Sequence, residues 1–376
     1  MLTVDNVTNF LLDRRLIDAN WIIDGPLTIR SLARRNRNLV IVGPGTAGFL
    51  IKQPYDLAEG GRETLRREAL FHGLCREEPA AALMAEVIPR LLDRDLDEAI
   101  LVFELIPGVA TLLSHLENPS GRGILVEAAH AFGQALGTFH RVFRAIDLDD
   151  SCLPWLSREI PSVMELHRPK AARRGTLSRA HCEILRNFQK TEVLGEILDG
   201  LRDLWRPETV IHADIKFDNV LVRPDSASPE SAAIEVWIAD WELVRFGDPA
   251  WDLAGALQDP LMTWVRSMPL TERLGDEEMI ARAALPLADL RGVARALWSG
   301  YRDEAELDPA EADGFLLRAV KFSAVRLLQT VCELSSFEDR VPAAAAMLMR
   351  VCEDLLMEPE NGQVILYGIS PGPPTS

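Results

Sequence analysis

The chain has 376 residues, of which 48% are apolar and 26% are charged. These proportions are ordinary for a folded soluble protein, and they exclude a chain that is disordered throughout. The formal net charge is −17, and because an acidic surface repels a phosphate backbone, we expect no nucleic-acid partner.

The first hundred residues predict a small β-sheet with a helix packed on it. Apolar residues at helical spacing indicate one helix over residues 1–19 and another over 63–76. Short runs of β-forming residues lie at 27–32, 39–42, 48–53 and 99–104. Together with the glycine-rich turn at 43–48, these runs predict a mostly antiparallel sheet.

The pattern changes after a hinge at residues 104–108, because helical spacing then dominates. We expect helices over 126–142, within 180–204 and over most of 279–356, with one short β region at 209–241. The residues from 358 onward are expected to be loose. The predicted fold class is α+β with two lobes, which are an antiparallel sheet lobe at 1–108 and a helical lobe at 109–357, followed by a tail at 358–376.

The residues suited to chemistry lie in the short β region. His212, Asp214 and Asn219 stand in the pattern H-x-D-x-x-x-x-N, and Asp240 ends the next apolar run. Phosphoryl transfer needs one carboxylate to orient the attacking hydroxyl and take its proton, and oxygen ligands to hold magnesium on the phosphates. The five-residue step lets one loop supply Asp214 for the first task and Asn219 for the second, with Asp240 as the other metal ligand.

These motifs resemble the catalytic loop of protein kinases and of aminoglycoside phosphotransferases. The tripeptide at 240–242 stands where protein kinases have D-F-G, and it resembles the I-D-W-E form of the phosphotransferases. The segments 246–254 and 137–140 also resemble that family, and the resemblance spans roughly residues 25–330. It implies a protein-kinase-like fold, ATP (or GTP) as the phosphoryl donor and Mg²⁺ as the cofactor. Residues 1–108 would then bind the nucleotide.

The resemblance also implies a lysine on the third strand that contacts the α- and β-phosphates. Lys52 lies in the sequence F-L-I-K, as in the V-A-I-K of protein kinases, and it is the only lysine in the first 160 residues. A glutamate of the following helix should pair with it. Glu68 is the first candidate, and Glu63 is the second.

Two further parts of the nucleotide site follow from the same resemblance. The hinge residues Glu104 to Ile106 would bind adenine through their backbone groups. The loop between the first two strands lacks the glycines of protein kinases, so Ser31 and Arg34 are the candidates to close over the phosphates. The alternative interpretation of that loop is a solvated hairpin tip.

Lys216 is the residue that helps to distinguish the acceptor classes. A cation two residues after Asp214 can offset charge on the transferring phosphoryl group. Serine/threonine protein kinases carry a lysine there, in H-R-D-L-K-P-E-N, but this chain has no A-P-E and no long activation segment. Three hypotheses stay open. They are a kinase of a small molecule, such as an aminoglycoside-, amino-sugar- or choline-like metabolite; a kinase of Ser or Thr in a precursor peptide, working with a partner enzyme; and a pseudokinase.

The spacing of residues along the sequence does not locate the acceptor site. Its expected walls are the segment 145–175 and the terminal helices, and the side chains considered are Asp147, Asp149, Asp150 and Trp155. The three acids are equally consistent with a solvated loop. His212 and Asp252 are expected to support the catalytic loop from the core, and Trp241 and Trp251 to pack within it.

The compartment is predicted from cysteines and hydropathy. The five cysteines are scattered and never spaced as a metal pair, which is typical of free thiols in a reducing compartment. The start of the chain lacks the basic end and apolar core of a signal peptide. The longest apolar run, at 100–113, is interrupted by Glu104 and Pro107 and is too short to span a membrane. We therefore expect a cytoplasmic protein without membrane contact.

Overall fold

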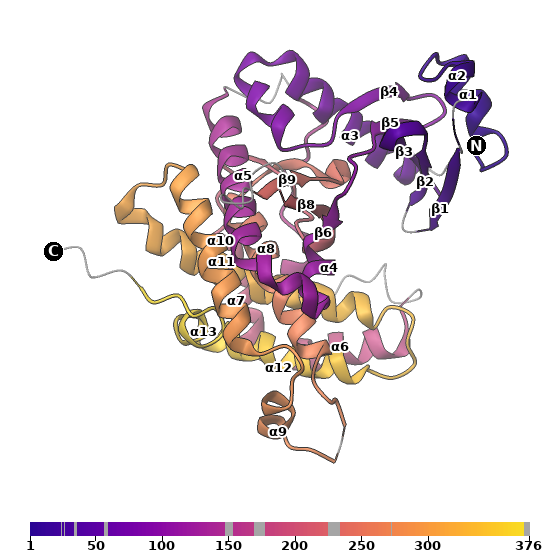
Figure 1. Cartoon of the computed structure of the whole chain (residues 1–376). Helices are drawn as coiled ribbons and strands as arrows, with labels where there is room; N and C mark the ends of the chain where they lie inside the picture. Colours follow the sequence, from indigo (N-terminus) through magenta and orange to yellow (C-terminus); the bar gives the residue numbers. More distant parts are fainter. Residues whose placement is uncertain are drawn as a thin grey trace.

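The N-terminal lobe is built on a five-stranded antiparallel sheet in the order β1-β2-β3-β5-β4. A computed structural model of the chain describes residues 1–23, 25, 27–33, 36–55, 59–146, 153–168, 177–224, 234–271 and 273–371, and Figure 1 shows its two lobes. The strands of this sheet are β1 (Thr28–Ala33), β2 (Asn36–Val42), β3 (Gly48–Pro54), β4 (Leu91–Asp95) and β5 (Ile100–Glu104). The predicted α+β, two-lobed fold is confirmed.

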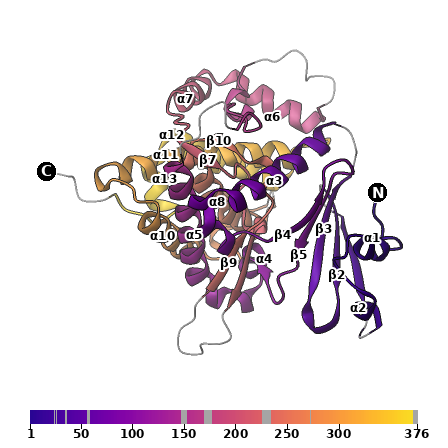
Figure 2. The same ribbon diagram turned by 90° about the horizontal axis from the view of Figure 1, so that it is seen from above.

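Alternation along β3 determines which way its lysine points. Phe49 and Ile51 lie on the face covered by α1 (Val7–Asp13), in one apolar cluster with that helix. Because successive strand residues point to opposite faces, Leu50 and Lys52 lie on the other face, where α3 (Glu59–Glu77) packs. Figure 2 shows α1 on the outer face of the sheet and α3 on the face toward the helical lobe. Lys52 therefore faces α3 and the helical lobe.

The N-terminal lobe departs from the sequence-based prediction in two places. The helix predicted over residues 1–19 is only the short α1, and a second short helix, α2 (Ala19–Ile23), begins where the predicted helix was expected to end. The break follows from Arg15, whose φ of 57° is incompatible with a continuing right-handed helix. Strand β4 was not predicted, because its polar residues at 93–95 hide the apolar pattern of a strand that lies at the sheet edge.

The helical lobe contains most of the remaining chain. Its main helices are α4 (Leu112–Glu117), α5 (Leu125–Ala145), α6 (Arg179–Lys190), α7 (Glu192–Asp203), α8 (Pro249–Arg266), α9 (Asp276–Ala281), α10 (Leu287–Glu304), α11 (Pro309–Leu334), α12 (Ala343–Met357) and α13 (Pro359–Ile365). The helix expected within 180–204 is interrupted at Thr191, whose backbone is extended. Trp241 and Trp251 are buried in this lobe, as predicted.

Two small sheets frame the predicted catalytic loop. One pairs β7 (Thr209–Ile211) with β10 (Arg245–Gly247), and the other joins β6 (Ala110–Thr111), β8 (Val220–Pro224) and β9 (Ile234–Ile238). The loop at 212–219 leaves β7 and enters β8. Its two ends are therefore held by different sheets.

The end of the chain is not loose as far as residue 371. Residues 359–365 form α13, and Tyr367 is buried, with its hydroxyl 2.7 Å from the hydroxyl of Ser323 in α11. The prediction of a loose tail from 358 was therefore wrong for this stretch. The proline-rich composition that motivated it belongs to residues 371–374, most of which lie outside the described residues.

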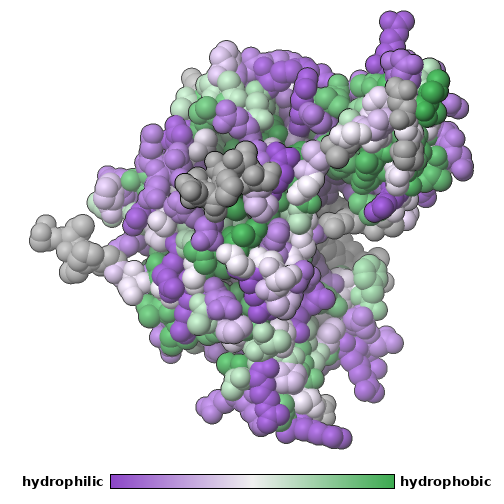
Figure 3. Space-filling model, viewed as in Figure 1, coloured by the Kyte–Doolittle hydropathy of each residue, from purple (hydrophilic) through white to green (hydrophobic). Residues whose placement is uncertain are grey.

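Surface and thiols are consistent with a folded globular chain. Figure 3 shows hydrophilic and hydrophobic residues intermingled, with the N-terminal lobe projecting from the helical lobe. In the described ranges no helix is both long and apolar enough to cross a membrane.

Cys75, Cys332 and Cys352 are buried free thiols and Cys182 is partly buried, whereas Cys152 lies outside the described residues.

Helices α5 and α10 cross so closely that the contact requires glycine. A Cβ added to Gly300 would lie 2.1 Å from the carbonyl oxygen of His130, and one added to Gly133 would lie 2.2 Å from that of Leu297. These contacts are backbone to backbone, so no side chain can move aside. The crossing holds α5, which carries His140, against α10.

We predict that Gly300→Ala lowers the free energy of unfolding by about 1–3 kcal/mol, because the helices must separate. Gly314→Ala is the matched control, since an added Cβ there meets no atom within 4 Å, and alanine in an exposed helix position stabilises by about 0.5–1 kcal/mol. Chemical denaturation measures both. Equal stability of the two variants would contradict the close crossing.

Candidate active site

The loop at 212–219 is held by acids of α8. Asp252 accepts hydrogen bonds from the backbone N–H groups of His212 at 2.6 Å and Ala213 at 2.8 Å. Asp259 accepts one from the N–H of Phe217 at 2.6 Å. Ala213 has a φ of 67°, a conformation that a non-glycine residue keeps only where its surroundings enforce it. The two carboxylates supply the partners that this irregular backbone lacks.

Asp252 is itself held in place by a buried hydrogen-bonded chain of His140 and Tyr301. Its side chain is fully buried and lies 3.2 Å from Nε2 of His140, whose Nδ1 lies 2.9 Å from the hydroxyl of Tyr301. Burial opposes the charged carboxylate, but hydrogen bonds from His140 and the loop backbone outweigh it and hold the pKa of Asp252 below its usual value. Asp252 therefore stays ionised and fixes the loop, which is the supporting role predicted for it.

The loop presents Asp214, Lys216 and Asn219 together. Lys216 Nζ donates to Asp214 Oδ2 at 2.8 Å, and Asn219 Nδ2 donates to the backbone carbonyl of Asp214 at 3.0 Å. Burial disfavours the ammonium, but the charge of Asp214 outweighs it and raises the pKa of Lys216. The amide nitrogen of Asn219 is therefore engaged, and no hydrogen bond to its side-chain oxygen is found among the described residues.

Lys52 lies in a cluster of carboxylates at the junction of the lobes. Its Nζ lies 2.6 Å from Glu68 Oε2, contacts Asp240 directly, and lies 4.0 Å from Glu242 Oε2. Burial disfavours the ammonium, but the three carboxylates outweigh it and raise the pKa of Lys52. Burial also raises the pKa of Glu68, to about 7, against the attraction of Lys52. One cation thus faces three acids. Glu63, the second candidate, is half-buried and lies 4.0 Å from Arg66 instead.

Asp240 occupies a strained turn. Its φ of 71° is unusual for a residue with a side chain. The next residue fixes the turn, because the ring of Trp241 stacks on Phe71 with centroids 4.2 Å apart, and its indole N–H donates to the carbonyl of Ile238 at 2.8 Å. The backbone N–H of Trp241 donates to Glu68. Asp240 is thereby held beside Lys52, whose charge outweighs burial and lowers the pKa of Asp240.

Asn219 and Asp240 fit a magnesium ion that shares its ligands with phosphates. The described residues contain no group of three His, Cys, Asp or Glu side chains able to hold a metal alone. Mg²⁺ usually binds through one or two carboxylates and completes its octahedron with substrate phosphates and water. One carboxylate and one amide oxygen, on segments joined by a 2.8 Å bond from Ala239 N–H to the Asn219 carbonyl, suit that mode of binding.

The hairpin between β1 and β2 is only partly described. Ser31 is exposed on the edge strand β1, and Arg34 lies outside the described residues. Asn36, which was not among the predicted site residues, is buried at the start of β2 and donates to Glu242 Oε2 at 2.7 Å. This bond ties the hairpin to the carboxylate cluster. No pattern in the sequence indicated it, because 206 residues separate the two partners.

The hinge has the geometry of a backbone recognition site. Glu104 ends β5, and its side chain is exposed 3.8 Å from Arg90. The N–H of Leu105 donates to the carbonyl of Gly48. The N–H of Ile106 has no acceptor among the described residues, so it is open to a ligand. Of the expected acceptor walls, Asp147, Asp149 and Asp150 lie outside the described residues, and Trp155 packs against the core of the helical lobe.

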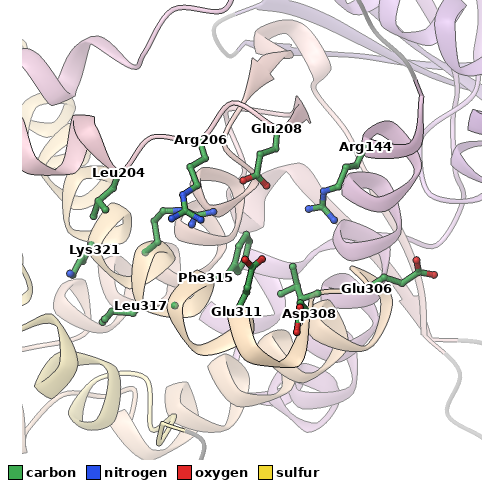
Figure 4. A pocket seen from close by; sticks show the side chains of 13 residues that line it. Arg144, Leu204, Arg206, Glu208, Glu306, Asp308, Glu311, Phe315, Leu317 and Lys321 are labelled. Carbon is green, nitrogen blue, oxygen red and sulfur yellow. The ribbon is translucent and has the colours of Figure 1, made fainter. Parts of the chain in front are cut away.

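A separate pocket of about 520 Å³ lies in the helical lobe away from these residues. Charged side chains of both signs, including Arg206 and Glu208 before β7 and Glu311 of α11, point into it (Figure 4). None of the predicted site residues lines it. Its mixture of charges does not indicate a particular ligand.

The chain is similar to known proteins in its sequence pattern and in its fold. The model of the phosphotransferase enzyme family (APH) matches residues 62–294. No curated protein sequence matches the chain. The amicoumacin kinase hAmiN, solved in complex with AMP-PNP, Ca²⁺ and Ami, has 13% identity, with 95% of this chain and 96% of that chain covered and a TM-score of 0.50. This likeness shows a shared fold.

Two further solved structures are similar at lower scores. An aminoglycoside 2′-phosphotransferase-IIIa variant in complex with GDP has 14% identity, a TM-score of 0.49, and coverage of 96% of this chain and 98% of that chain. Choline kinase LicA from Streptococcus pneumoniae has 14% identity, a TM-score of 0.46, and coverage of 92% and 98%.

Burial of His72 behind the lysine predicts acid sensitivity. His72 lies on α3, and burial, helped by the charge of Lys52, lowers its pKa from 6.5 to about 3. The folded protein keeps this ring neutral, whereas the unfolded chain takes up a proton below pH 6.5, so stability falls as the pH falls. Between pH 7 and pH 5, the free energy of unfolding of the wild type should fall by about 2 kcal/mol more than that of His72→Leu. Parallel stability profiles of the two proteins, measured by denaturation, would contradict this.

Proposed function

The chain belongs to the phosphotransferase enzyme family, and we propose that it transfers the γ-phosphate of ATP to a hydroxyl group of a small molecule. The observation that carries the proposal is the convergence of the paired Lys52 and Glu68, the turn at Asp240 and the loop that presents Asp214. These groups come from both lobes, and each has a distinct task in phosphoryl transfer.

The N-terminal lobe would bind the nucleotide. Lys52, held by Glu68, would exchange its contact with Asp240 for the α- and β-phosphates. The free N–H of Ile106 would donate to the adenine ring. Asn219 and Asp240 would hold Mg²⁺, which neutralises phosphate charge when bound. ATP is the first choice of donor, and the hinge side chains leave GTP open as an alternative.

The helical lobe would carry out the transfer. Asp214 orients the acceptor hydroxyl and takes its proton, while the hydroxyl oxygen attacks the γ-phosphorus in line with the departing oxygen of ADP. The new bond is oxygen to phosphorus, and the bond that breaks is the one to the β-phosphate oxygen. Lys216, already against Asp214, would offset charge on the transferring group.

The segment after Asp240 supports a small acceptor. It passes through one 3₁₀ turn over Trp241–Leu243, enters the short strand β10, and begins α8 at Pro249. This leaves no long activation segment on which an extended peptide could lie. The acceptor classes that we propose are aminoglycoside-, amino-sugar- or choline-like compounds.

One contact favours a second candidate. Lys216 lies 2.8 Å from Asp214, at the position where serine/threonine protein kinases carry their lysine. A kinase of Ser or Thr in a precursor peptide, acting together with a partner enzyme, is therefore the alternative function.

The test is the transfer of label from γ-labelled ATP with Mg²⁺ to two panels, one of cationic hydroxylated small molecules and one of Ser/Thr peptides. We expect the wild type to label small molecules, and Asp214→Asn to lower turnover by about 10²–10⁴-fold because the base is lost. ATP affinity should change little, since Asp214 faces the acceptor.

Three outcomes would change this assignment. Labelling of peptides alone would establish the second candidate. Wild-type turnover in Asp214→Asn would remove Asp214 from its role. Absence of nucleotide binding by the wild type would leave a pseudokinase that acts through a partner.

A further inference from the structure

Arg326 of α11, a helix that packs against α8, also reaches the loop at 212–219. Its guanidinium donates to the carbonyl of Ala213 at 3.4 Å and to that of Ile215 at 3.2 Å. These are the carbonyls on either side of Asp214. The Nη2 atom also lies 3.5 Å from Asp214 Oδ1. One side chain thus contacts the backbone of both neighbours of Asp214 and lies close to the carboxylate of Asp214 itself.

The arginine is fixed in place by its surroundings. It is only 6% exposed, its Nη1 lies 3.1 Å from Gln329 Oε1, and its guanidinium lies 5.3 Å from the centre of the Trp251 ring. Burying a guanidinium is costly unless its donors are satisfied. The rigid fork of arginine can satisfy two carbonyls and a carboxylate at once, which a lysine cannot do.

The two helices divide the loop between them. The acids of α8 bind N–H groups of the loop, and Arg326 binds its carbonyls. The backbone of α8 also presses directly on the loop, since a Cβ added to Gly255 would lie 2.5 Å from the carbonyl oxygen of Ile215. The two oxygens of Asp214 are divided in the same way, because Lys216 contacts Oδ2 and Arg326 faces Oδ1.

The residue at position 213 differs from that of serine/threonine protein kinases. The residue before the catalytic aspartate is arginine in the H-R-D of serine/threonine protein kinases and alanine here. The guanidinium beside the loop comes instead from a helix more than a hundred residues later, outside residues 62–294 that match the family.

We propose that Arg326 is a positioning residue for the transfer step, which orients the carboxylate of Asp214 toward the acceptor by holding the carbonyls on both sides of it. The inference rests on the proposed function. It adds that catalysis depends on α11, and that Arg326 acts on turnover rather than on nucleotide affinity.

Arg318 provides a matched control. It lies on the same helix, is 7% exposed, and forms a buried ion pair with Asp248 at 3.0 Å. That pair caps the start of α8, and no contact joins Arg318 to the loop at 212–219 in the described part of the chain. Removal of Arg318 leaves the buried Asp248 without its ion pair. Removal of Arg326 leaves the carbonyls of Ala213 and Ile215 without this donor, while Asp214 keeps Lys216. Both variants should therefore lose stability.

The experiment compares Arg326→Met, Arg326→Lys and Arg318→Met with the wild type. The measurements are thermal unfolding, ATP affinity, kcat and KM for the best acceptor of the two panels, and hydrogen–deuterium exchange of residues 212–219. We expect Arg326→Met to lower kcat by about 10²-fold with ATP affinity unchanged, because small misplacement of a reacting group costs that much. Arg326→Lys should keep the charge but lose most of the turnover.

Exchange in the loop should rise in Arg326→Met and stay at the wild-type level in Arg318→Met, and kcat of Arg318→Met should stay within about threefold of the wild type. In a further variant, Arg326→Ala, added guanidinium ion should restore part of the lost activity. Equal losses of kcat in the two Met variants, or unchanged loop exchange in Arg326→Met, would overturn the proposal. If the wild type transferred no phosphate, the proposed function would fail, and loop exchange would still decide whether Arg326 positions Asp214.

Discussion

The ion cluster around Lys52 joins the two lobes and sets the geometry of the site. Lys52 and Glu68 come from β3 and α3, and Asp240 and Glu242 come from the turn after β9. A buried charge is tolerated only with partners, so the cluster fixes the sheet, α3 and the turn relative to one another. Because one cation faces three carboxylates, the site has an excess of negative charge. A divalent cation that withdraws Asp240 from Lys52 would relieve that excess and free the lysine for phosphates.

Side chains of the helical lobe fix the backbone of the loop at 212–219 in the same site. The loop at 212–219 has irregular backbone, and its polar groups are bound by side chains of two long helices rather than by a sheet. Asp252 and Asp259 of α8 hold its N–H groups, and Arg326 of α11 holds its carbonyls. The close crossing of α5 and α10 supports this scaffold through His140, which contacts Asp252. Catalytic geometry therefore depends on packing well outside the motif.

The sequence predicted the parts of this structure that depend on local pattern. Asp214 and Asn219 were predicted because their spacing is tied to their chemistry, and Lys52 because F-L-I-K resembles the V-A-I-K of protein kinases. Asn36 and Arg326 could not be found that way, since their partners lie 206 and more than 110 residues away. Local conformations also escaped prediction, because the helix breaks at Arg15 and Thr191 lack proline or glycine. Tyr367 shows the same limit, as its burial depends on α11 and not on its neighbours.

The central claim is that the carboxylate cluster and Lys52 form a site for a nucleotide with magnesium. The most direct measurement is calorimetric titration of ATP into the wild type and Asp240→Asn, each with and without Mg²⁺. The account predicts that Mg²⁺ tightens ATP binding to the wild type and has much less effect on Asp240→Asn, because one metal ligand is lost. ATP affinity that is independent of Mg²⁺ in the wild type, or an equal Mg²⁺ effect in both proteins, would contradict it.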